Sequence, residues 1–208
     1  MSFLDYWSVR LAAVCTIVFF LQLSFGPLTD QLVLSSQDFL YRPWTLVTSI
    51  FAHGGFDHLF YNMFALLLFG TILESVIGGK RWLIVFFAAG VIGGIAGLPL
   101  YDSTLGASGA IFGLMGALAV LRPRMTVYLG WFPLPMAVAV LFWAAGDLLG
   151  LFVPSGIANA AHLAGLAVGL VIGWKLRPEF GELAAIKRKH GVDIPESRWR
   201  EWEDRWMR

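Results

Sequence analysis

The sequence is poor in charged residues. Only 14% of its 208 residues are Asp, Glu, Lys or Arg, whereas a soluble domain carries about a quarter. The charges are also segregated, because residues 177–208 hold fifteen of the twenty-nine and the preceding 176 residues hold only fourteen. Together with a mean hydropathy of +0.71, this pattern excludes an ordinary soluble domain. It predicts a membrane domain over residues 1–176 and a charged, Trp-containing tail over residues 177–208.

Other absences narrow the possibilities. The single cysteine, Cys15, excludes an intramolecular disulfide. The apolar stretches are continuous rather than alternating with polar residues, which argues against a membrane β-barrel. The sequence has no nucleic-acid motif, metal-binding cluster or phosphate-binding loop, so we expect no cofactor, no metal and no nucleic-acid partner. The first apolar stretch lacks a clear signal-cleavage site, and we interpret it as a retained anchor helix.

What the sequence does have is long apolar segments. A helix that spans a membrane needs about 20 apolar residues. We find six candidates, of which the fourth is short, and therefore expect an all-α membrane protein with a bundle of six transmembrane helices. The long connection from Pro27 to about Gly55 is expected to be partly embedded in the interface. The six segments are 9–26, 56–77, 82–101, 107–121, 130–152 and 157–176.

The basic residues between these segments predict the orientation. Under six spans, nearly all of them fall on one side of the membrane, and the other side has only Arg42. The positive-inside rule then places both termini in the cytoplasm. We expect a multi-pass protein, in a prokaryotic plasma membrane. The basic residues on the cytoplasmic side, besides those of the tail, are Arg10, Lys80, Arg81, Arg122, Arg124 and Lys175.

Four polar residues occur at similar depth below the outer face. Ser108 lies at the start of the fourth segment, and His162 lies about 8 Å into the sixth at 1.5 Å per residue. His58 and Asn62 are four residues apart near the outer end of the second segment, so they share one helix face. Polar residues inside a membrane are functional candidates by default.

The residue types predict nucleophilic catalysis. Glycines spaced four apart in the sixth segment let it approach the glycine-rich fourth segment closely, which would bring His162 to Ser108. A serine hydroxyl needs such a base to become a nucleophile. No acid is obviously placed to orient His162, so we predict a Ser–His dyad. Asp147 in the fifth segment could be a third catalytic member, a substrate contact or a hydrogen-bonding partner in helix packing.

Three motifs together resemble the rhomboid intramembrane serine proteases. The stretch HGGFDHLFYN, with His53, His58 and Asn62, is similar to the family's histidine and His-x-x-x-Asn pattern. Gly106-Ala107-Ser108-Gly109 is similar to its nucleophile motif, and Ala161-His162-x-x-Gly165-x-x-x-Gly169 to its base-bearing last helix. The resemblance covers about residues 8–176, and the order and spacing of the motifs agree.

The resemblance implies a role for each residue. Ser108 would be the nucleophile and His162 the general base, while His58, Asn62 and the Ser108 backbone would stabilise the oxyanion. His53 would be a structural or water-binding neighbour, and Gly106 would support the nucleophile.

The long first loop would be the embedded hairpin of the family fold. It departs from the family's usual Trp-Arg pair, because this chain has Trp44-Thr45, and Arg42 is the nearest replacement for the guanidinium. The expected substrates are single-pass transmembrane proteins with small or helix-breaking residues near the cut. They would enter between the second and fifth segments, with Phe142 and Trp143 as a lateral gate.

Two other functions fit parts of the pattern. An inactive rhomboid-like protein would bind membrane clients without cleaving them, although the presence of both Ser108 and His162 argues against it. A small proton-coupled transporter would use His58, His162 and Asp147, but the sequence lacks the repeats or broken helices that transporters tend to show. In the tail, Trp199, Trp202 and Trp206 would form one stripe on a helix. We expect this stripe to dock on the inner membrane interface, unless the segment is an ordinary helix packed on a partner or a mostly disordered end.

Overall fold

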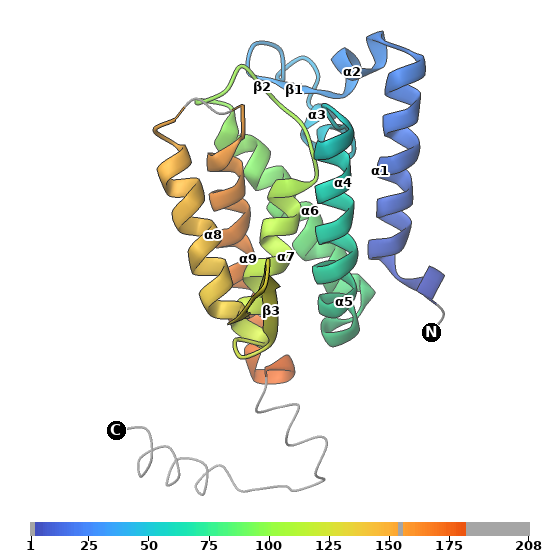
Figure 1. Ribbon diagram of the computed structural model, residues 1–208. Coiled ribbons are helices and arrows are strands. Elements are labelled where there is room, and N and C mark those ends of the chain that lie inside the picture. Colours follow the sequence, from blue (N-terminus) through green and yellow to red (C-terminus); the bar gives the residue numbers. More distant parts are fainter. Residues whose placement is uncertain (1–2, 154–155, 182–208) are drawn as a thin grey trace, which may run out of the picture.

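The computed structural model describes residues 3–153 and 156–181 as a bundle of helices (Figure 1). The Trp stripe and nearly all of the predicted tail lie outside the described residues. The longer helices are α1 (Trp7–Ser24), α4 (Phe56–Ala65), α6 (Gly79–Gly97), α7 (Ser108–Leu121), α8 (Met136–Gly150) and α9 (Asn159–Phe180). The shorter ones are η1 (Phe3–Asp5), α2 (Pro27–Leu32), α3 (Thr45–Thr48), η2 (Ser49–Phe51), η3 (Leu66–Gly70) and α5 (Thr71–Ile77).

Four of the described helices are long and apolar enough to cross a membrane: α1, the continuous helix α4–η3–α5 over Phe56–Ile77, α6 and α9. Helices α7 and α8 are apolar but shorter, with 14 and 15 residues. The protein is therefore a multi-pass membrane protein with a helical bundle. Each predicted segment overlaps one of these helices, although most of the bounds differ by several residues. The second, 56–77, is one continuous helix in the structure.

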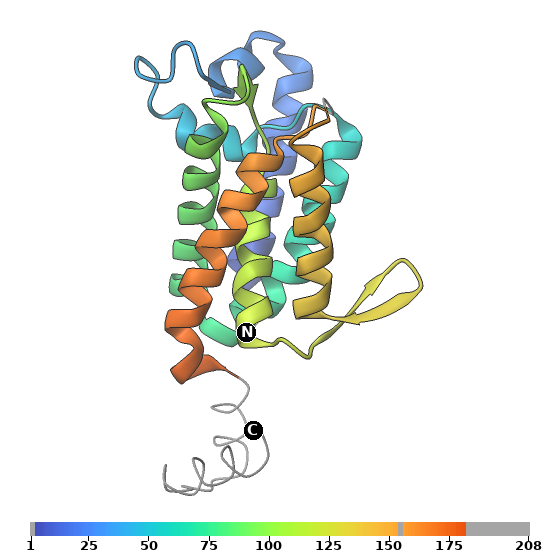
Figure 2. The same cartoon turned by 90° about the vertical axis from the view of Figure 1, so that its left-hand side faces the viewer.

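Helix α7 is the centre of the bundle, and nearly all of its residues are buried. It packs against α9 through glycines on both helices (Figure 2). A Cβ added to Gly165 or Gly169 would collide with the backbone of Gly109 or Gly113, respectively. The contact predicted from the glycine spacing is thus confirmed, since only glycine allows the two backbones to come so close.

The predicted start of the fifth segment is wrong. Residues 130–135 belong to a β-hairpin formed by β3 (Thr126–Leu129) and β4 (Phe132–Pro135), and α8 begins only at Met136. Pro133 and Pro135 disfavour a helix there. Gly130, with φ of +61°, provides the turn between the strands. The hairpin lies at the opposite end of the bundle from the start of α7 (Figures 1 and 2). We call these the hairpin end and the site end.

The first loop folds over the site end and is held there by hydrogen bonds. Strand β1 (Leu34–Ser35) pairs with β2 (Ser103–Thr104) in the connection that leads into α7. Arg42 forms an ion pair with Asp38 at 2.6 Å and donates to the carbonyl oxygen of Asp30 at 2.7 Å. Arg42 therefore ties the two parts of the loop together.

Candidate active site

Ser108 is the first residue of α7, and the sequence before it shapes this position. Gly106 has φ of +115°, a left-handed conformation that favours glycine. A side chain at Gly106 would also collide with the ring of His58. Both the backbone conformation and the lack of space beside His58 therefore require glycine at position 106. The turn places Ser108 at a helix N-terminus, where backbone N–H groups lack intrahelical partners.

His162 lies directly against the serine. Its Nε2 is 2.8 Å from the Ser108 hydroxyl oxygen. The imidazole ring stacks on Phe112, with centroids 4.5 Å apart and an angle of 9° between the planes. The structure thus brings Ser108 and His162 together, as the glycine spacing of α7 and α9 predicts. Phe112 lies one helical turn after Ser108, on the same face of α7, and its ring stacks on the imidazole and fixes its plane. This contact was not predicted from the sequence.

The expectation that no acid is placed to orient His162 is wrong. Asp147, on α8, has Oδ1 3.0 Å from Nδ1 of His162, and both side chains are mostly buried. Its other oxygen, Oδ2, is buried and has no hydrogen-bond partner among the described residues. Ser108, His162 and Asp147 therefore form one hydrogen-bonded series across α7, α9 and α8. Within the described residues, no three His, Cys, Asp or Glu side chains are grouped to hold a metal ion.

His58 and Asn62 flank the serine from α4. The amide nitrogen of Asn62 donates to the carbonyl oxygen of His58 at 2.7 Å, and Asn62 lines the same cavity as Ser108. The ring of His58 packs against Gly106, two residues before the serine. An amide carries two N–H donors, so Asn62 keeps one for a group bound beside Ser108.

His53 lies behind His58, and its side chain is 1% exposed. The two rings are 5.2 Å apart. Burial, and to a smaller extent repulsion by His58, lowers the pKa of His53 to about 4. Gln22 of α1 holds the backbone of His53, since it accepts from its N–H at 3.0 Å and donates to its carbonyl oxygen at 3.3 Å. The sequence analysis missed Gln22, because a single glutamine in an apolar helix gives no sign of its partner.

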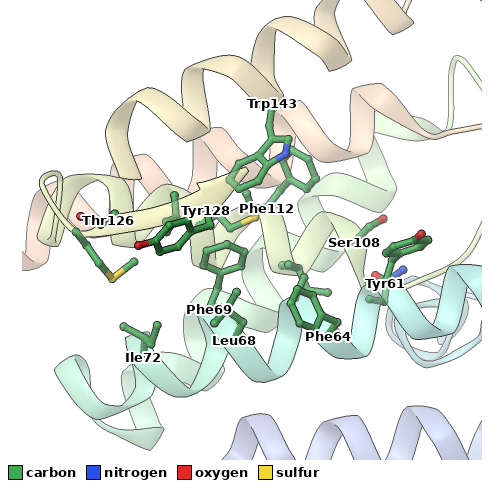
Figure 3. A pocket seen from close by; sticks show the side chains of 16 residues that line it. Tyr61, Phe64, Leu68, Phe69, Ile72, Ser108, Phe112, Thr126, Tyr128 and Trp143 are labelled. Carbon is green, nitrogen blue, oxygen red and sulfur yellow. The ribbon is translucent and has the colours of Figure 1, made fainter. Parts of the chain in front are cut away.

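An apolar groove of about 500 Å³ runs from Ser108 between α4–η3–α5 and α8. Figure 3 shows Ser108 and Tyr61 at one end and Ile72 and Thr126 at the other. Trp143 of α8 lies over the groove and makes an edge contact with Phe69, with centroids 5.9 Å apart. Of the two predicted gate residues, Trp143 therefore lines the groove. Phe142 does not line it and is 60% exposed.

Known proteins resemble this chain over most of its length. The sequence model of the Rhomboid domain matches residues 41–179. The chain is 36% identical over 134 residues to the "Putative rhomboid protease YdcA" of Bacillus subtilis. The matched region covers 63% of this chain and 66% of that relative. The chain is 32% identical over 156 residues to "Rhomboid protein 1, mitochondrial" of Saccharomyces cerevisiae. Here the matched region covers 70% of this chain and 45% of the relative.

A third relative is the "Rhomboid protease GluP" of Bacillus subtilis, 38% identical over 129 residues, or 61% of this chain and 24% of the relative. The chain thus spans less than two thirds of the length of these relatives.

Proposed function

The chain belongs to the rhomboid family, and from that premise we propose that it is an intramembrane serine endopeptidase that cuts transmembrane proteins near the outer membrane face. The observation that carries the proposal is the 2.8 Å approach of His162 Nε2 to the Ser108 hydroxyl inside an apolar bundle. A serine in this position has its base within reach of proton transfer. The groove that begins beside it offers a path for an apolar polypeptide.

In the proposed reaction, Ser108 attacks the scissile carbonyl carbon while its proton passes to Nε2 of His162. The tetrahedral intermediate collapses, the C–N bond breaks, and the imidazolium gives this proton to the leaving amine. Water then attacks the acyl ester and gives a proton to His162. The ester bond breaks, and Ser108 regains its proton from the imidazolium.

We assign Asp147 a positioning role in this reaction. Its carboxylate accepts a hydrogen bond from Nδ1–H of His162, which leaves Nε2 as the acceptor for the serine proton. The negative charge also stabilises the imidazolium that forms during each proton transfer. The predicted dyad is thereby extended by a carboxylate that does not itself touch the substrate.

The oxyanion would be stabilised from the opposite side. The backbone N–H of Ser108 is at the start of α7, Asn62 with its second N–H lines the same cavity, and the His58 ring packs against Gly106. Fixed donors of this kind often make the largest contribution to the rate, because they are already oriented before the charge develops. His53 and Gly106 support this side of the site.

The short central helix supports a site that water can reach from the outer face of the membrane. Helix α7 has 14 residues and is therefore about 21 Å long, compared with a hydrocarbon core of about 30 Å. We propose that α7 and α8 complete a six-span bundle with both termini in the cytoplasm. Ser108 would then lie several ångströms below the outer face, in a cavity open to water under the first loop.

The proposal is tested in proteoliposomes that contain the purified protein and a model single-pass substrate with Gly or Ala near the expected cut. We expect the wild-type protein to cleave it, and Ser108→Ala and His162→Ala to be inert yet folded. Ser24→Ala, an exposed serine on α1, is the matched control and should retain activity. Substrate binding without cleavage by the wild-type protein would instead identify a client-binding relative.

A further inference from the structure

The β3–β4 hairpin carries large apolar side chains on its outside. Trp131, at the turn between the strands, is 95% exposed, and Phe132 beside it is 74% exposed. Neither residue lines the groove beside Ser108. Exposed apolar surface of this kind marks a contact with another protein or with a membrane.

The aromatic side chains of the hairpin are not accompanied by charged ones. Residues 125–146, which include the hairpin and most of α8, contain no Asp, Glu, Lys or Arg. A two-stranded hairpin is only marginally stable when water surrounds it on all sides. The composition of this hairpin therefore favours an environment that is less polar than bulk water.

The position of the hairpin gives a second, independent observation. Figure 2 shows that it projects sideways from the bundle, with its turn level with the first turns of α8 and not beyond the ends of the helices. These turns of α8 expose Val138 and Leu141, to 45% and 69%, and such side chains face lipid in a membrane bundle. The turn of the hairpin therefore lies at the depth of the membrane.

The backbone of β4 is suited to a place with little water. In an antiparallel pair, the N–H groups of successive residues alternate between the partner strand and the free edge. Met136, which follows β4 directly, donates its N–H to the carbonyl oxygen of Met125 at 2.8 Å, so the residues on either side of this register position face away from β3. Pro133 and Pro135 are the residues of β4 in that outward register. Because proline has no N–H, this edge has no backbone donor that needs water.

The same edge excludes the hydrocarbon core as the location of the hairpin. The carbonyl oxygens of Pro133 and Pro135 remain as acceptors, and open sheet edges do not occur within the hydrocarbon region of a membrane. In the headgroup region, water and lipid headgroups supply donors to such oxygens. The aromatic side chains and the backbone edge thus point to the same layer, between water and the acyl chains.

We propose that the β3–β4 hairpin is an interfacial anchor, with Trp131 and Phe132 inserted between the phospholipid headgroups of the leaflet at the hairpin end. Aromatic rings favour this layer, because they combine an apolar body with groups that tolerate a polar surrounding. The anchor fixes the start of α8 relative to the membrane. It does not rest on the proposed protease function, since a relative that only binds clients would be anchored in the same way.

The first test measures the depth of residue 131 in proteoliposomes of phosphatidylethanolamine and phosphatidylglycerol. Trp131→Cys, in a Cys15→Ala background, is labelled with a nitroxide, and its collision rates with oxygen and with a water-soluble nickel chelate are compared. Lys80→Cys, at an exposed position at the start of α6, is the aqueous reference, and Ile84→Cys, at a 62% exposed position of α6, is the lipid reference. We expect the oxygen-to-nickel ratio for Trp131→Cys to lie between the two, at least about threefold above that of Lys80→Cys.

The second test locates the same position along the lipid. A bimane label on Trp131→Cys is quenched with phospholipids brominated either near the headgroup end or near the free end of the acyl chains. We expect the former to quench at least about twofold more strongly. Phe132→Cys should give the same order, which provides an independent variant if Trp131→Cys does not fold.

Three results would contradict the anchor. A ratio equal to that of Lys80→Cys would mean that the hairpin lies in water. Low collision rates with both reagents would mean that a protein surface, such as a second copy of this chain, covers the turn. Stronger quenching by bromine near the free ends of the acyl chains would place the turn in the hydrocarbon core. None of these results would bear on cleavage, which Ser108→Ala tests separately.

Discussion

Asp147 and His162 meet across the contact between α8 and α9, with a carboxylate oxygen 3.0 Å from Nδ1 of the imidazole. The contact fixes the direction of the ring, and the stacked Phe112 fixes its plane. His162 is thus oriented before any substrate binds. Orientation of this kind lowers the barrier, because the reacting groups need not be arranged during the reaction.

Replacing this carboxylate should therefore affect turnover more than binding. We expect Asp147→Asn to lower kcat by about 10- to 100-fold with little change in KM, because the amide cannot stabilise the imidazolium. Steady-state kinetics in proteoliposomes measure both constants. Asp102→Asn, an exposed aspartate in the connection before α7, is the control. An unchanged kcat would reduce Asp147 to a partner in helix packing.

Opening the contact between Trp143 and Phe69 should speed cleavage. We expect Trp143→Ala to raise the cleavage rate of a transmembrane substrate severalfold, because this contact crosses the groove through which the substrate reaches Ser108. Phe142→Ala is the matched control, since Phe142 is exposed and outside the groove lining. A slower rate for Trp143→Ala, or equal increases for both variants, would contradict this account of the gate.

The glycine contact between α7 and α9 should be intolerant of a single methyl group. We expect Gly169→Ala to lower the free energy of unfolding by about 1–3 kcal/mol, since its Cβ would collide with the backbone of Gly113. Unfolding in mixed micelles measures this change. Gly146→Ala on α8, where a Cβ meets nothing within 4 Å, should be neutral or stabilising. Similar losses for the two variants would show that the close approach of α7 and α9 is not what requires Gly169.

Glu74 should anchor the first helix. Its buried carboxylate accepts hydrogen bonds from the backbone N–H groups of Trp7 and Ser8, at 2.7 and 2.9 Å, and so caps the start of α1. Loss of such a partner costs about 1–3 kcal/mol. We expect Glu74→Ala to destabilise the protein by this amount and to expose the start of α1 to proteolysis. Ser75→Ala, its exposed neighbour, should do neither; matching behaviour of the two variants would argue against the cap.

The stability of the fold should depend on pH through His53. The pKa of this histidine is lowered from 6.5 to about 4, so between these values the unfolded chain binds more protons than the folded one. The contribution of His53 to the free energy of unfolding is present above pH 6.5. It is lost as the pH falls toward 4, and the total loss is roughly 3 kcal/mol. Thermal unfolding of the wild-type protein and His53→Asn at pH 7.5, 5.5 and 4.5 should show a smaller loss in the variant. Parallel curves would mean that another group is responsible.

The helices were predictable because hydropathy alone determines where an apolar segment must be. The same signal could not reveal the hairpin, since Phe132 and Leu134 are as apolar as the helix that follows. The two prolines and Gly130 of this stretch were the available sign, and their conformational limits would have placed the start of the helix at Met136.

The sequence could predict how deep the site residues lie below the outer face, but not how each helix is rotated about its axis. Ser108 and His162 could be paired because glycines mark the contacting faces of α7 and α9. No glycine pattern shows which face of α8 contacts a neighbour. The direction of the Asp147 side chain therefore depends on how α8 is rotated about its axis. Hydropathy does not specify that rotation, because α8 is apolar on nearly all sides. The partners of Gln22 and the stacking of Phe112 depend on tertiary packing in the same way.

The proposed mechanism requires that His162 activates the hydroxyl of Ser108. Labelling with a fluorophosphonate probe, followed by mass spectrometry of the peptides, tests it most directly. We expect one adduct, on Ser108, that is absent in Ser108→Ala and at least tenfold slower to form in His162→Ala. An adduct on another residue, or equal labelling rates in the wild-type protein and His162→Ala, would contradict it.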